Sequence, residues 1–155
     1  MSAVTNYSFY AVPAIWVVGI SSHFYAISLT KTCKDLPDFT NVNPREFLRR
    51  VQNQEKRTPV VDEYLRAESA NANTFENWPI FAAAVVAGNL ARLPVRYMNL
   101  FAGGYVLSRV LFATLYIKTT SEKWSNLRSL VYVAGIGSIF TTFIKAGNAF
   151  QSILL

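Results

Sequence analysis

The sequence holds one cysteine and one histidine, and both shortages exclude classes of chemistry. Cys33 on its own excludes an internal disulfide and any metal site built from cysteines. A histidine metal cluster or a histidine-dependent triad would have to be built on His23 alone. We therefore expect no metal site. We interpret Cys33 as a thiol near a membrane interface, and His23 as an interfacial or helix-packing residue.

Charge is also scarce, and the shortage indicates a membrane protein. Only 15% of the 155 residues are charged and 52% are hydrophobic, whereas a soluble domain usually has about a quarter charged residues. The net charge of +6 does not indicate nucleic-acid binding, because the basic residues lie between long apolar blocks, as juxtamembrane charge does.

Four segments have the length and composition of long helices. Residues 7–30 contain no charged side chain, and about 20 apolar residues span a bilayer core. Further helices are expected at about residues 59–90, 95–117 and 124–146. Residues 31–58 form a polar loop in which REFLRRVQ predicts a short interfacial helix. We predict one domain over residues 1–155, an all-α, integral membrane, up-and-down four-helix bundle that crosses the bilayer four times.

The distribution of basic residues predicts the orientation. Loops 31–58 and 118–128 carry ten Lys and Arg, whereas the opposite ends of the predicted helices carry three. Since basic loops stay on the cytosolic side, both loops are expected in the cytosol and both termini in the lumen or outside the cell.

Three of the predicted helices carry polar residues at spacings that place them on one face. A charge near the bilayer centre costs at least about 3 kcal/mol, so such residues persist where they pair with each other or bind something. The aligned sets are Arg66 with Asn73 and Glu76, Arg109 with Tyr116, and Arg128 with Tyr132.

Together these faces predict a basic pocket that opens to the cytosol. It would suit a small ligand with carboxylates, because arginine binds carboxylates in a bidentate manner. Glu76 would pair with a ligand amine or with a neighbouring arginine. The alternative is structural: Arg66 and Arg128 extend to the interface, while Glu76 and Arg109 pair with each other.

Three stretches resemble a known family. RAESANANTFENWPIF (66–81) is similar to a pattern of Arg-Ala, then Asn-x-x-Glu, then proline with aromatics. SRVLFATLY (108–116) is similar to Arg-Val with a tyrosine seven residues after the arginine, and RSLVY (128–132) to Arg-Ser-x-x-Tyr. In order and spacing they resemble the membrane-associated proteins in eicosanoid and glutathione metabolism (MAPEG). This family includes microsomal glutathione transferases, leukotriene-C synthase and microsomal prostaglandin E synthase.

The resemblance implies a homotrimer in the endoplasmic-reticulum membrane, with glutathione as co-substrate between neighbouring subunits. The second substrate would be a lipophilic electrophile or peroxide that arrives through the lipid. Arg128 would stabilise the glutathione thiolate. The residues that would bind glutathione are Arg66, Asn73, Glu76, Arg109, Tyr116 and Tyr132.

The sequence departs from the family in three features: the long loop 31–58, Lys31 at the end of the first helix, and the spacing of ten positions from Arg66 to Glu76. These departures favour a general glutathione transferase or peroxidase over an eicosanoid enzyme. The alternatives are a non-catalytic lipid-binding protein of the same architecture and an unrelated transporter or scaffold with four crossings. A transporter would be expected to have an inverted repeat, and none is evident.

Overall fold

The computed structural model describes residues 4–154, and the side chains of residues 4–152. Over this range the chain forms five α-helices and one 3-10 helix, and no strand. The predicted all-α class is confirmed. The domain was predicted over residues 1–155, of which residues 1–3 and 155 lie outside the described residues.

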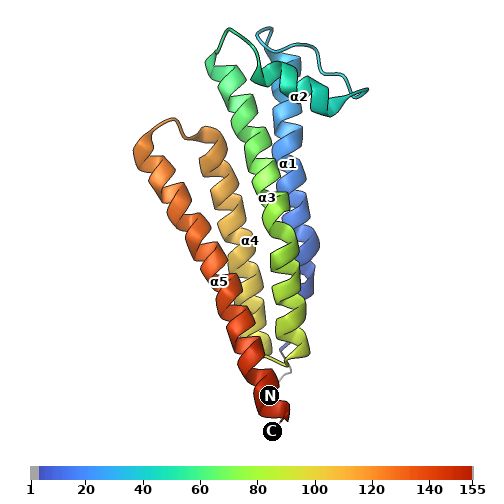
Figure 1. The fold of residues 1–155 in the computed structure, drawn as a ribbon, viewed down its shortest axis with the longest axis vertical. Coiled ribbons are helices and arrows are strands. Elements are labelled where there is room, and N and C mark those ends of the chain that lie inside the picture. Colours follow the sequence, from blue (N-terminus) through green and yellow to red (C-terminus); the bar gives the residue numbers. More distant parts are fainter. Residues whose placement is uncertain (1–3, 155) are drawn as a thin grey trace.

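Four long helices lie side by side, and a short fifth helix crosses them near one end (Figure 1). The long helices are α1 (Ala11–Thr32), which follows the 3-10 helix η1 (Ser8–Tyr10), α3 (Pro59–Leu90), α4 (Val95–Lys118) and α5 (Glu122–Leu154). The short helix α2 (Pro44–Gln52) lies within the long loop, where a helix was predicted.

The last helix differs most from its predicted bounds of 124–146. It begins at Glu122 and continues to Leu154, a length of 33 residues, or about 50 Å. Because the hydrocarbon core of a bilayer is about 30 Å thick, this helix is long enough to extend beyond the core. The prediction ended it where the apolar run weakens, near Lys145, although no glycine turn or proline follows to stop the helix.

Local signals explain where the other helices begin and end. The side chain of Thr58 accepts a hydrogen bond from the backbone N–H of Val61, and Pro59 occupies the first helical turn of α3. After α3 ends, Arg92 turns the chain toward α4 with a φ of 55°. Asn43 caps α2 in the same way, since its side chain accepts from the N–H of Glu46.

Two hydrophobic clusters hold the helices together. One lies nearer the chain termini and includes Phe81 and Tyr105, whose rings stack at 4.3 Å between centroids. The other lies under α2 and includes Phe47 and Tyr64. Of the predicted site residues, Tyr116 packs against the second cluster, and Arg66 bonds the backbone of its member Ile117.

Both termini lie at one end of the bundle, whereas α2 and the turn between α4 and α5 lie toward the other (Figure 1). Among the described residues, three helices are long and apolar enough to cross a membrane, in the segments Ser8–Thr32, Val95–Lys118 and Glu122–Ser152. Helix α3 is not among them, because its first half is rich in charged residues and its second half contains Glu76, Asn77 and Asn89. The fourth crossing therefore stays a prediction.

Candidate functional site

Arg109 is the buried centre of the site. Its side chain comes from α4 and is only 2% exposed. One Nη atom donates a hydrogen bond of 2.6 Å to Oδ1 of Asn73 on α3 and a longer one of 3.4 Å to the hydroxyl of Thr74. The guanidinium also lies 4.3 Å above the ring of Phe112. Helices α3 and α4 thus share a buried charge that has amide, hydroxyl and aromatic partners.

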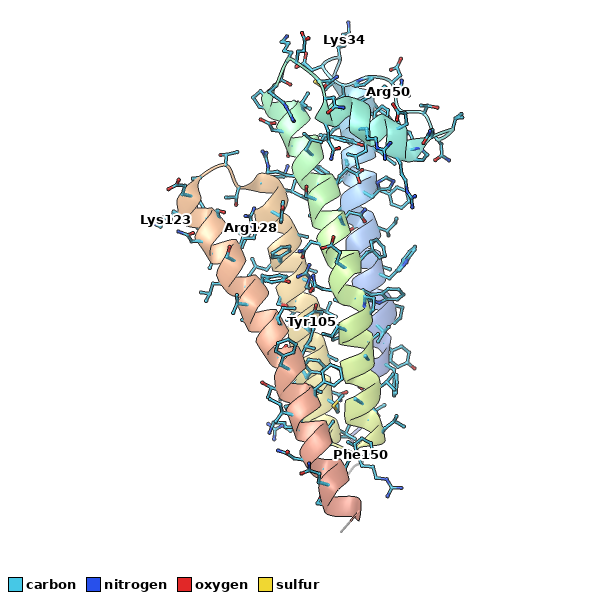
Figure 2. The ribbon with its side chains drawn as sticks, in the orientation of Figure 1. Lys34, Arg50, Tyr105, Lys123, Arg128 and Phe150 are labelled. Carbon is cyan, nitrogen blue, oxygen red and sulfur yellow. The ribbon has the colours of Figure 1, made fainter. Side chains whose placement is uncertain are left out.

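Arg128 lies in the second turn of α5, just after the connection from α4 (Figure 2). Its Nη2 donates a hydrogen bond of 3.0 Å to the hydroxyl of Ser125, one turn earlier on the same helix. Its guanidinium stacks 4.3 Å above the ring of Tyr116 on α4. These two contacts fix the cation against α4 without neutralising it.

Tyr132 joins α5 to α3 and to α4. Its hydroxyl donates a hydrogen bond of 3.5 Å to Oδ1 of Asn77, and its ring centroid lies 5.8 Å from that of Phe112. Phe112 also packs against Tyr116, with 5.5 Å between centroids. The structure therefore gathers five of the seven predicted site residues from three helices around Phe112, namely Asn73, Arg109, Tyr116, Arg128 and Tyr132.

The other two predicted residues lie at the margin of this cluster. Arg66 donates a hydrogen bond of 2.8 Å from Nε to the backbone carbonyl of Ile117, which joins α3 to the last turn of α4. Glu76 is exposed. Within the part of the chain that the structure describes, it forms no ion pair, so the predicted pairing with a neighbouring arginine does not occur in a single chain.

Sequence reasoning missed two residues of the site, Asn77 and Tyr105. Asn77 is buried and accepts from Tyr132, while Tyr105 is 3% exposed. Among residues 4–152, the Tyr105 hydroxyl and Nε of Arg109 are buried without a hydrogen-bond partner. Both residues were detectable, because Asn77 lies four residues after Asn73 and Tyr105 four before Arg109, each on the same helix face.

The cluster keeps its positive charge. The described side chains form two ion pairs, Arg57 with Asp62 and Lys118 with Glu63, and one hydrogen-bonded pair, His23 with Glu68. None of these includes Arg66, Arg109 or Arg128. A site with arginines that lack carboxylate partners, together with amide and phenol groups, is suited to an anionic ligand.

His23 belongs to a different part of the molecule. Its Nδ1 lies 2.7 Å from Oε1 of Glu68, at a cavity of about 200 Å³ between α1, α2 and α3. Oδ1 of Asn71, which also lines the cavity, is buried without a partner in the described chain. His23 therefore pairs with Glu68 and packs between helices, as the interpretation of a packing residue proposed. No group of three or more metal-ligating side chains occurs among the residues described.

Comparison with known proteins identifies one match. A family model described as the MAPEG family matches residues 9–148, nearly the whole chain. Neither the curated proteins nor the solved structures gave a match. The matched range includes every residue of the cluster around Phe112.

Proposed function

The chain belongs to the MAPEG family, and on that premise we propose that it is a membrane-bound glutathione transferase. It would conjugate glutathione to a lipophilic electrophile or use glutathione to reduce a lipophilic hydroperoxide. Family membership and three apolar helices make it an integral membrane protein. The observation that carries the proposal is the single cluster in which Arg109 bonds Asn73 while Arg128 stacks on Tyr116.

The cluster is complementary to glutathione in charge. Glutathione carries two carboxylates and one ammonium, so its net charge is negative at neutral pH. Arg66 and Arg109 are cations without a carboxylate partner in the described chain, and each could receive a carboxylate. The exposed carboxylate of Glu76 is free to receive the ammonium. Asn73 and Tyr132 would supply hydrogen bonds.

Arg128 would activate the thiol. A cysteine thiol has an unperturbed pKa of about 8.5, and a nearby guanidinium favours the thiolate and so lowers that pKa. The proton would leave to water. The thiolate sulfur would then form a bond to the electrophilic carbon and displace its leaving group. With a hydroperoxide, two glutathione molecules would give the disulfide, the alcohol and water.

The proposal extends to assembly and location. Glu76 lies on a face of α3 that is exposed in the single chain, together with Ile80, which is 37% exposed. A second copy on this face would enclose the glutathione, as expected of a homotrimer with sites between subunits. All four long helices would cross the endoplasmic-reticulum membrane, with α2 in the cytosol and both termini in the lumen.

The test is stopped-flow ultraviolet absorbance of the detergent-purified protein mixed with glutathione. We expect a saturable thiolate band that Arg128→Ala removes. Arg96→Ala is the matched control. It removes an exposed arginine from the first turn of α4, at the end of that helix away from Tyr116 and Arg128, and should keep the thiolate band. Isothermal calorimetry on the same samples measures glutathione binding separately.

Each outcome decides between specific alternatives. If Arg128→Ala still binds glutathione but no longer shows the thiolate band, this arginine acts at the thiol. A band unchanged in that variant would remove Arg128 from the mechanism. If the wild-type protein shows no thiolate band and binds no glutathione, the transferase proposal is rejected and the non-catalytic lipid-binding alternative is favoured.

A further inference from the structure

Helix α2 has two different sides. Phe47 is 1% exposed and Val51 is fully buried. The Phe47 ring packs against Phe39 and Tyr64, with centroid distances of 5.3 and 6.0 Å. The apolar side of α2 is therefore held by the bundle, and the helix cannot turn this side toward lipid without losing its own core contacts.

The position of α2 brings it alongside the end of a membrane helix. The cavity beneath it is lined by Pro44 and Leu48 from α2 and by Ile20 and His23 from α1. His23 lies nine residues before Thr32, where α1 ends, or about 14 Å along the axis. Helix α2 thus lies across the bundle (Figure 1), packed against α3, with the cavity between it and the second half of α1, a helix long and apolar enough to cross a membrane.

Helix α2 carries three arginines and one carboxylate, Glu46, so its net charge is positive, and an exposed valine precedes it. Arg45, Arg49 and Arg50 are all exposed, and Figure 2 places Arg50 at this end of the bundle. None of the three forms an ion pair with a carboxylate among the described residues. Val42, which precedes the capping residue Asn43, is 93% exposed. Guanidinium groups beside an exposed aliphatic side chain are typical of a surface that contacts lipid headgroups and the outermost acyl carbons.

We propose that the outer side of α2, formed by Val42, Arg45, Arg49 and Arg50, binds anionic phospholipid headgroups of the adjacent leaflet. The three arginines supply bidentate donors for phosphate, and Val42 enters the interface. Phospholipid is favoured over a free anion because the charged side lies beside a membrane helix and includes an apolar group. This binding is independent of glutathione chemistry, so it stands even if the proposed transferase activity is absent.

The test measures lipid affinity on the full-length protein in neutral detergent. Phosphatidylglycerol and phosphatidylcholine are titrated separately, and bound lipid is counted by native mass spectrometry. The variant R45Q/R49Q/R50Q should bind phosphatidylglycerol more weakly, by about fivefold for each arginine removed. Because all three side chains are exposed, the fold should persist, and circular dichroism checks it.

A control variant with the same loss of charge separates local recognition from net charge. R96Q/K123Q/K145Q removes three exposed cations from α4 and α5 and should keep the wild-type affinity. Val42→Asn should lower affinity for the phospholipid without affecting binding of inorganic phosphate. The proposal is rejected if both triple variants lose affinity equally, if phosphatidylcholine binds as well as phosphatidylglycerol, or if millimolar inorganic phosphate displaces the lipid.

Discussion

The bond between Arg109 and Asn73 gives the sharpest test of the site's energetics. Asn73→Leu removes the acceptor that lies 2.6 Å from the guanidinium and leaves only the 3.4 Å contact with Thr74. A hydrogen bond to a charged group contributes about 1.5–3 kcal/mol, and the arginine is 2% exposed in the single chain, so little water reaches it to replace the acceptor. We expect Asn73→Leu to destabilise the fold by about 3 kcal/mol.

Substitution of the other partner, Arg109, should destabilise the fold less. Arg109→Met removes the stacking on Phe112, worth about 0.5–2 kcal/mol, but it also removes a buried charge whose Nε has no partner in the described chain. The half-buried Asn73 oxygen that remains can turn toward water. We therefore expect a loss of about 1 kcal/mol, and the double variant should lose little more than this because no charge is left unpaired.

The assay is a double-mutant cycle by reversible unfolding in mixed detergent micelles containing sodium dodecyl sulfate. The predicted coupling energy is about 2.5–3 kcal/mol. A coupling energy below about 0.5 kcal/mol, the usual scatter of independent sites, would refute the reasoning and show that Arg109 draws its stabilisation from other groups.

Three further predictions concern packing and the ligand. A Cβ at Gly88 would lie 2.6 Å from Sδ of the fully buried Met98, so Gly88→Ala should cost about 1–3 kcal/mol. Gly103→Ala, with no atom within 4 Å of the added carbon, should be neutral or stabilise by up to about 1 kcal/mol; thermal unfolding compares the two, and equal effects would contradict the packing argument. Glu76→Gln should weaken glutathione binding in calorimetry without changing the melting temperature, since the side chain is exposed; unchanged affinity would remove it from the site. Tyr116→Leu should reduce the thiolate band less than Arg128→Ala does, and an equal loss would give the ring more than a positioning role.

Much of the fold could be predicted because the signals are local. The charge-free run at 7–30 predicts a helix without any long-range contact, and the cap that Thr58 and Pro59 give α3 is equally local. The length of α5 could not be predicted in this way, because its last turns are amphipathic rather than apolar and no breaker marks their end.

For the site, the sequence predicted which residues share a helix face but not which faces meet. Spacing by three, four or seven residues places Asn73, Arg109 and Tyr132 on defined faces, and the structure brings these faces together. Which neighbour a face meets depends on the angles and depths at which the helices cross, and these are set by side-chain packing between distant segments. The exposure of Glu76 was not visible in the sequence for this reason.

The sequence by itself determined that this is an all-α membrane protein, which segments are helical, and which polar residues share a face. Those properties depend on composition, periodicity and caps, each of which acts within a few residues. Only the tertiary structure decided that Arg109 bonds Asn73, that Arg128 stacks on Tyr116, and that Asn77 accepts a hydrogen bond from Tyr132. These contacts join residues 12 to 55 positions apart, and the packing of whole helices against one another selects them.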